Sequence, residues 1–163
     1  MLRLARPPKD YLGKGTISAI QMTDEFLLST GDKNSTPPHL SVWVESCTTP
    51  AQAYRFLQEN SPNSERKLVL RLRVDEIRML AVMVNNVEYK TLLDVLWVHL
   101  FEDSIRNIKD QRPGAEGHAG ITGLDEKSAP KGLTNGEAKN LRKSLRSQLA
   151  ELASKDHHLL SLP

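Results

Sequence analysis

The chain has few of the residues that would cross-link a fold or carry it through a membrane. Of its 163 residues, one is cysteine and only eight are aromatic, with three Phe, three Tyr and two Trp. A single cysteine, Cys47, cannot form a disulfide within the chain, so we expect a small buried thiol and a protein of the reducing cytosol. No apolar run approaches the roughly 18 residues of a membrane span, which predicts a cytoplasmic protein without membrane contact.

An excess of one charge is also missing. Lysine and arginine number 22 against 20 acidic residues, a formal net charge of +2. This balance does not by itself indicate nucleic-acid binding, so a basic surface would have to come from segregation of charges along the chain. The sequence contains no phosphate-loop, dinucleotide or zinc-protease motif, and its cysteine count excludes the usual structural zinc site. We therefore expect neither a metal nor a cofactor.

The clearest pattern lies in residues 38–74 and predicts a strand, a helix and a second strand. Residues 40–44, LSVWV, are bulky or β-branched and lie between proline-containing turns, as is typical of a strand. Thr49 followed by Pro50 is a helix start, because the threonine hydroxyl can cap the helix and proline suits its first position. The spacing of apolar residues extends that helix over residues 50–60.

The second strand of this pattern covers residues 67–74, where apolar residues alternate. One face carries Leu68, Leu70, Leu72 and Val74, and the other carries Val69, Arg71 and Arg73. The intervening helix makes a crossover, so the strands at 40–44 and 67–74 are expected to run parallel if they share a sheet.

The C-terminal region predicts the longest helix, over residues 135–154. It begins after Thr134, and its leucines recur at three- and four-residue spacing. We expect this stripe to pack on the sheet, with a homodimer through the C-terminal helix as the alternative. The opposite face is basic and carries Lys139, Arg142, Lys143 and Arg146.

The remaining segments complete the predicted fold. Residues 1–14 are expected to be a basic N-terminal arm, residues 92–101 a central strand, and residues 102–132 a long loop containing glycine and proline with a short strand at 118–122. Together these elements predict one globular domain over residues 1–163. Its class is α/β or α+β, with a mixed sheet of about four to six strands and helices 50–60 and 135–154 packed on it.

Two histidines stand at the beginnings of predicted strands. His39 lies two residues before Ser41, so both side chains project from one face of a strand, and His118 begins the segment HAGIT. The His-x-Ser motif, followed by a helix, resembles the first motif of the two-histidine phosphoesterase superfamily. That resemblance implies one histidine as base, the other as acid, and hydroxyls that hold phosphate. The second motif departs from this pattern because Gly120 occupies the hydroxyl position, so we expect His39 and His118 to lie apart.

These observations predict a small cytosolic binding or regulatory module without enzymatic activity, whose partner is more readily a protein than a nucleic acid. Two alternatives stay open. One is a metal-independent phosphoesterase or nucleotide-processing enzyme that uses His39, Ser41 and His118. The other is a nucleic-acid-binding accessory protein. The binding residues that we expect are Arg71, Arg73, Lys139, Arg142, Lys143 and Arg146.

Overall fold

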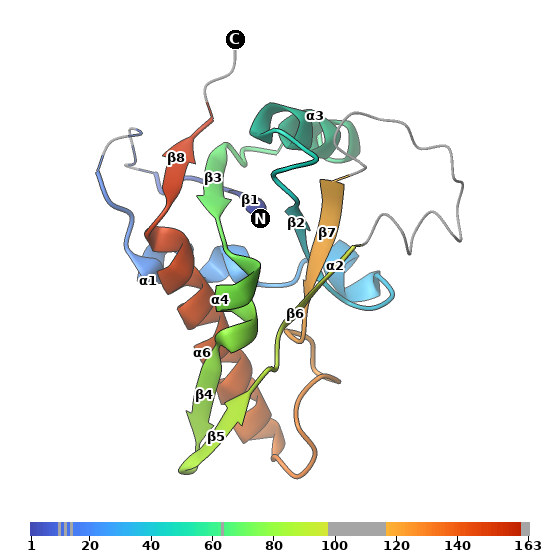
Figure 1. Ribbon diagram of the computed structural model, residues 1–163, viewed down its shortest axis with the longest axis vertical. Coiled ribbons are helices and arrows are strands. Elements are labelled where there is room, and N and C mark those ends of the chain that lie inside the picture. The colour runs from blue at the N-terminus through green and yellow to red at the C-terminus, as the bar shows by residue number, and fades with distance from the viewer. Residues whose placement is uncertain (10, 12, 14, 63, 98–116, 161–163) are drawn as a thin grey trace.

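Six short strands form one sheet in the computed structural model, which describes residues 1–9, 11, 13, 15–62, 64–97 and 117–160 (Figure 1). Their order across the sheet is β6-β7-β2-β1-β3-β8, and every pairing is antiparallel among the described residues. The strands are β1 (Leu2–Ala5), β2 (Leu40–Trp43), β3 (Leu68–Arg71), β6 (Asp94–Trp97), β7 (His118–Thr122) and β8 (His157–Leu159). This antiparallel pairing selects α+β from the two predicted fold classes.

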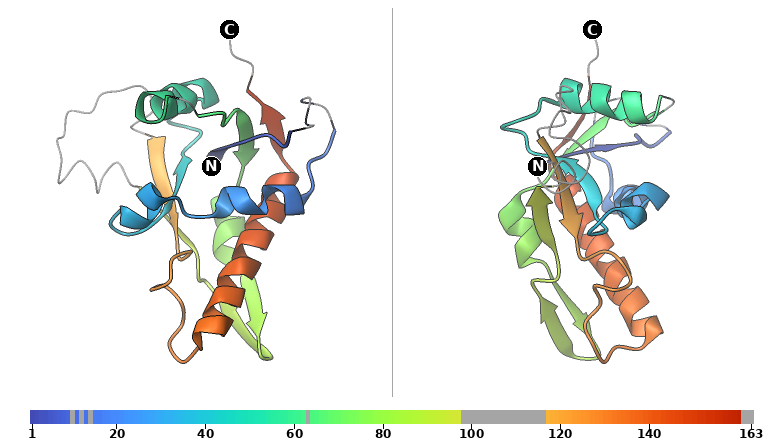
Figure 2. Two further views of the ribbon diagram at one scale, coloured as in Figure 1. Left: turned by 180° about the vertical axis from the view of Figure 1, so that it is seen from behind. Right: turned by 90° about the vertical axis from the view of Figure 1, so that its right-hand side faces the viewer.

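The two predicted helices are present with the predicted bounds, α3 (Pro50–Asn60) and α6 (Asn135–Ser154). Figures 1 and 2 show α3 at one end of the molecule, and α6 at the opposite end beside the hairpin of β4 (Ala81–Val84) and β5 (Val87–Lys90). The other helices of the described residues are short: α1 (Ala19–Met22), which contacts α6, the 3-10 helix η1 (Thr23–Phe26), α2 (Thr30–Asn34) and α4 (Val74–Met79).

The two faces of the sheet have separate cores. On one face, Leu2 opposite Trp43 and Leu4 opposite Val69 pack with Ala53 of α3. The other face packs against α6 through buried apolar side chains, among them Leu40, Val42, Leu68, Leu70, Ala119 and Ile121. A side chain's position along a strand therefore decides which helix it contacts.

Capping accounts for the accuracy of the helix bounds. The Thr49 hydroxyl accepts a hydrogen bond from the backbone N–H of Gln52, and Thr134 accepts one from Glu137. In α6 the leucine stripe is buried within the chain at Leu141, Leu145 and Leu149, which confirms that it packs on its own domain.

The N-terminal residues form a strand where a basic arm was predicted. Leu2–Ala5 form β1, a fully buried strand between β2 and β3. Arg3 can lie in this interior because its guanidinium donates hydrogen bonds to the backbone oxygens of Ser41, at 2.7 Å, and Glu25, at 2.9 Å. Since β1 is antiparallel to both neighbours, β2 and β3 run parallel as predicted, but with β1 between them.

Two further expectations need correction, on residues 92–101 and on Cys47. The strand predicted at residues 92–101 covers Asp94–Trp97 and lies at the edge of the described sheet, and residues 98–101 lie outside the described part. Residues 102–116 of the predicted loop at 102–132 are likewise outside it, and the short strand predicted at residues 118–122 is confirmed as β7 (His118–Thr122), which lies inside the described sheet. The thiol of Cys47 is exposed rather than buried.

None of the described helices has the length and apolar character needed to cross a bilayer.

Candidate functional site

The structure brings His39 and His118 together, so their predicted separation is wrong. Strands β2 and β7 are neighbours, and their register places Ser41 opposite Gly120 and Trp43 opposite His118. His39 precedes β2 with the same alternation, so both histidines lie on the face of the sheet that carries α3. The centroids of the two imidazole rings are 6.0 Å apart, in an edge-to-face arrangement.

Gly120 makes this approach possible. A Cβ atom at position 120 would lie 2.5 Å from both Cγ and Cδ2 of His39, closer than any contact between real atoms of this kind. The imidazole of His39 therefore lies over the glycine and leans along the sheet toward His118. From the sequence, Gly120 was notable because it lacks the hydroxyl of the phosphoesterase motif. In the structure, its lack of a side chain leaves room for the imidazole of His39.

Two aromatic rings lie beside His118 of the histidine pair. The His118 ring centroid lies 5.6 Å from that of Trp43 and 5.9 Å from that of Phe56 on α3. His39 is only 3% exposed, and its Nδ1 lies 2.8 Å from the backbone oxygen of Pro37. Because a carbonyl oxygen can only accept, Nδ1–H is the donor and Nε2 is the nitrogen left for any further contact. The pair lies in an aromatic cluster between the sheet and α3.

The hydroxyl of Ser41 is hydrogen-bonded to the carboxylate of Asp32. Its hydroxyl donates to Oδ1 of Asp32 at 3.1 Å, and Oδ2 of the same carboxylate accepts from the backbone N–H of Ser29 at 2.8 Å. Burial raises the pKa of Asp32, but the hydrogen bonds from Ser29, the nearby charge of Arg3 and the hydrogen bond from Ser41 outweigh it and hold that pKa below its ordinary value. The hydroxyl of Ser41 thus orders α2 against β2.

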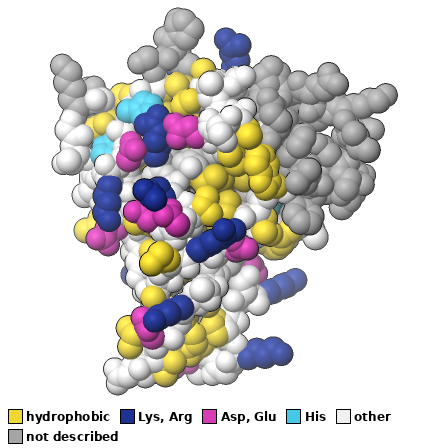
Figure 3. Space-filling model, viewed as in Figure 1, with side chains coloured by type: hydrophobic (Ala, Val, Ile, Leu, Met, Phe, Trp, Pro, Cys, Tyr) yellow, Lys and Arg dark blue, Asp and Glu magenta, His cyan; other side chains and the backbone are white. Residues whose placement is uncertain are grey.

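Arg71 and Arg73 are both paired with carboxylates. Arg71 contacts Glu45 at 2.8 Å and Asp156 at 3.4 Å, and Arg73 contacts Asp75 at 2.8 Å. Figure 3 shows cationic and acidic side chains interspersed on one face of the molecule. The charge of these two arginines is compensated within the chain, which leaves less of it for a partner.

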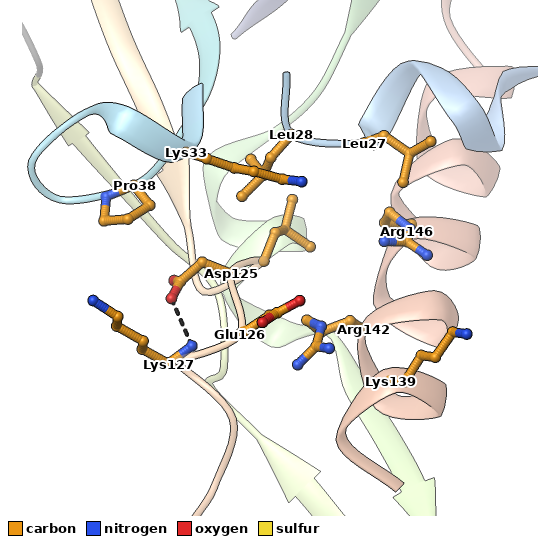
Figure 4. A pocket seen from close by; sticks show the side chains of 11 residues that line it. Leu27, Leu28, Lys33, Pro38, Asp125, Glu126, Lys127, Lys139, Arg142 and Arg146 are labelled. Carbon is orange, nitrogen blue, oxygen red and sulfur yellow. Dashed lines mark hydrogen bonds between the residues drawn. The ribbon is translucent and has the colours of Figure 1, made fainter. Parts of the chain in front are cut away.

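A cationic pocket of about 730 Å³ lies between α6, α2 and the loop that follows β7 (Figure 4). Of the four basic residues predicted on α6, Lys139, Arg142 and Arg146 line this pocket and Lys143 does not. Two further cations reach it from other segments, Lys33 of α2 and Lys127 of the loop. The apolar part of the wall consists of Leu27, Leu28, Pro38 and Leu124, and the two carboxylates are Asp125 and Glu126.

The five cations of the pocket lack acidic partners within the described part of the chain. None of them belongs to an ion pair there. The carboxylate of Asp125 is occupied by its own turn, where it accepts from the backbone N–H of Lys127 at 2.8 Å and from the hydroxyl of Ser128. The five cations outnumber the two carboxylates of the lining, and an excess of like charge around one cavity destabilises the chain that carries it, so this arrangement suits an anionic ligand.

Arg146 is the most enclosed of these cations. Its Nε atom is buried and has no hydrogen-bond partner among the described residues. Burial lowers the pKa of Arg146, and the adjacent charge of Arg142 lowers it further, while Asp24 raises it. A buried donor without an acceptor is costly, so this guanidinium is held at an energetic disadvantage in the described structure.

Sequence reasoning missed Lys33 and Lys127 because each is a single lysine in a loop or short helix. The only signal in the sequence was the glycine- and proline-rich composition of both segments, which favours exposed loops but does not place the two lysines together.

Within the described ranges, no three His, Cys, Asp or Glu side chains gather as metal ligands would. No protein-family model, no curated protein and no solved structure matches this chain.

Proposed function

We propose that the protein is a small cytosolic binding or regulatory module, without enzymatic activity, that holds an anionic partner in the cationic pocket. The observation that carries this proposal is the set of five pocket cations that form no ion pair within the described residues. The apolar wall adds support, because ligand sites combine apolar surface with a few converging polar groups, and a volume of about 730 Å³ lies within their usual range.

The test uses the stabilisation that a ligand confers on the native state. A ligand that binds only the folded protein raises its melting temperature, and the rise grows with the logarithm of the ligand concentration once that concentration exceeds Kd. We expect citrate or pyrophosphate, added at low ionic strength, to raise the melting temperature of the wild type. The double variant Arg142→Gln/Arg146→Gln should lose this shift.

Lys143→Gln is the matched control, because Lys143 lies on the same helix but does not line the pocket. It removes one positive charge and should keep the shift. Equal shifts in all three proteins would mean that the anions act by general screening, and the proposal would fail. Retardation of RNA or DNA at low salt, lost in the double variant, would identify a nucleic-acid backbone as the partner instead.

A second candidate function is a metal-independent phosphoesterase at His39 and His118, and the 6.0 Å approach of their rings favours it. Acid and base catalysis requires two groups that can reach one substrate from opposite sides. The third residue of the predicted set, Ser41, is less suited, because its hydroxyl donates to Asp32.

Hydrolysis of a chromogenic phosphodiester in the presence of a chelator tests this candidate. An enzyme of this kind should lose about 100-fold or more of its rate in both His39→Ala and His118→Ala. His158→Ala is the control, since that histidine lies on β8 and contacts Arg71. Absence of hydrolysis by the wild type, or equal rates in all variants, would remove the phosphoesterase.

A further inference from the structure

We propose that the anion held in the cationic pocket is a phosphate monoester, with its phosphate between Arg142 and Arg146 and its organic part on the leucines of the wall. This inference rests on the proposed function and specifies the ligand. The two arginines are four residues apart on α6, which places them one turn apart on the same face of the helix. Figure 4 shows both side chains at the α6 wall of the pocket.

The number of charges and acceptors distinguishes phosphate from carboxylate. A carboxylate carries one charge and two oxygens, which match the fork of a single guanidinium. A phosphate monoester carries up to two charges and three terminal oxygens, so it can accept from two guanidinium groups at once. Two adjacent arginines without an acidic partner among the described residues therefore fit the dianion better.

The lysines extend this preference around the cavity. Lys33 reaches the pocket from α2, on the side opposite Lys139, and Figure 4 shows its side chain directed toward α6. Lysine ammonium groups act as point charges without a fixed geometry. They raise the local concentration of any anion, whereas the arginines select its shape.

The apolar wall suits the organic part of the ligand. Leu27 is 46% exposed although it is a large apolar residue, and with Leu28 and Leu124 it forms a surface beside the arginines. Covering such a surface with a carbon chain is favourable, at about 25 cal/mol for each Å² removed from water. The lining contains no aromatic side chain among the described residues, so stacking of a base is not part of the proposal.

Calorimetric titration of the full chain with hexyl phosphate, hexanoate and inorganic phosphate tests the inference. Hexyl phosphate should bind about tenfold or more tightly than hexanoate, the difference expected for one charge-assisted hydrogen bond. It should also bind more tightly than inorganic phosphate, and Leu27→Ser should reduce that second difference. Equal affinities for the phosphate and the carboxylate would overturn the inference.

Charge-preserving variants separate shape from charge. Arg142→Lys and Arg146→Lys keep the positive charge but lose the fork, so each should weaken hexyl phosphate about tenfold and change hexanoate little. Retained phosphate affinity in both variants would overturn the inference while leaving the proposed anion binding intact. If neither anion binds the wild type, the proposed function fails as well.

Glu126 gives a test of the opposite sign. It is the exposed carboxylate of the lining, and its charge repels an anion. Glu126→Gln should therefore tighten the binding of hexyl phosphate, and weaker binding in this variant would overturn the proposal.

Vesicles of phosphatidylcholine with and without phosphatidic acid identify the source of the phosphate ester. Vesicle binding that depends on both phosphatidic acid and Arg142 supports a lipid phosphate. Binding of hexyl phosphate without vesicle binding supports a soluble ester.

Discussion

The Cγ atom of His39 lies 2.5 Å from the position that a Cβ atom on Gly120 would occupy. The two residues belong to neighbouring segments of the sheet, so the absence of a side chain in β7 determines where an imidazole beside β2 can lie. The placement of His39 toward His118 therefore depends on a glycine that contributes no polar group of its own.

Gly120→Ala should lower the free energy of unfolding by about 1–3 kcal/mol, because the added methyl group overpacks the space that His39 fills. Urea denaturation measures this change. In a His39→Gly background the same substitution should cost clearly less, since the Cβ, Cγ and Cδ2 atoms of His39 that the methyl group would meet are all gone. Gly136→Ala is the control: a Cβ there meets nothing within 4 Å, and the exposed helical position should gain about 0.5–1 kcal/mol. An equal cost of Gly120→Ala in both backgrounds would contradict the geometry.

Leu145→Ala should lower the free energy of unfolding by about 2–5 kcal/mol, the range for a fully buried leucine. The cost has two parts, the lost burial of the side chain and the cavity that remains beside the sheet. Ser144→Ala, on the exposed face of the same helix, should change stability by less than about 0.5 kcal/mol. Similar urea midpoints for the two variants would show that the stripe of α6 is not in the core.

The hydrogen bonds of Asp32 predict a pH dependence of stability. Its pKa is lower in the folded chain than in the unfolded chain, so the folded state favours the ionised carboxylate. This contribution is fully present above the unfolded pKa of about 4 and is lost as the pH falls through the folded pKa. Asp32→Asn should therefore be less stable than the wild type at neutral pH.

The stability difference between wild type and Asp32→Asn should shrink as the pH is lowered from 7 to about 3. Urea midpoints at a series of pH values measure it. Glu65→Gln removes an exposed carboxylate and serves as the control for the change of one charge. A difference that grows toward acid pH would contradict the direction of the shift.

Thr134→Ala should lower stability by about 0.5–2 kcal/mol, because the first turn of α6 loses the hydroxyl that caps the Glu137 amide. Thr134→Ser keeps a hydroxyl at the same place and should retain most of the stability. Circular dichroism during urea unfolding reports both the helix content and the midpoint. Identical midpoints for the alanine and serine variants would mean that this cap contributes little.

Local signals in the sequence were sufficient for the helices. Thr49 with Pro50, and Thr134 ahead of the leucine stripe, fix helix starts by chemistry that acts within four residues. The strand β1 was not predicted, because four residues that include Arg3 look like a basic arm. Its burial depends on the backbone oxygens of Ser41 and Glu25, which accept from Arg3 and lie far from it in sequence.

The candidate sites were predictable in part for the same reason. The basic face of α6 follows from helical spacing, and His39 and His118 were identified by their positions at strand starts. Their convergence could not be predicted, because it depends on the pairing of β2 with β7 and on the space above Gly120. The opposing wall of the pocket, with Lys33 and Lys127, likewise exists only after the sheet has formed.

The order of strands in the sheet also has a consequence for folding kinetics. Strand β1 lies between β2 and β3, so Leu2 pairs with Trp43 and Ala5 with Leu68, while Leu70 of β3 pairs with His157. Each of these pairings closes a long loop before it gains any contact energy. Chains dominated by such distant pairings fold in roughly milliseconds to seconds, whereas helical bundles need only microseconds to milliseconds. We expect the capped helices α3 and α6 to form early, and the histidine pair and the cationic pocket to form in the slower step that assembles the sheet.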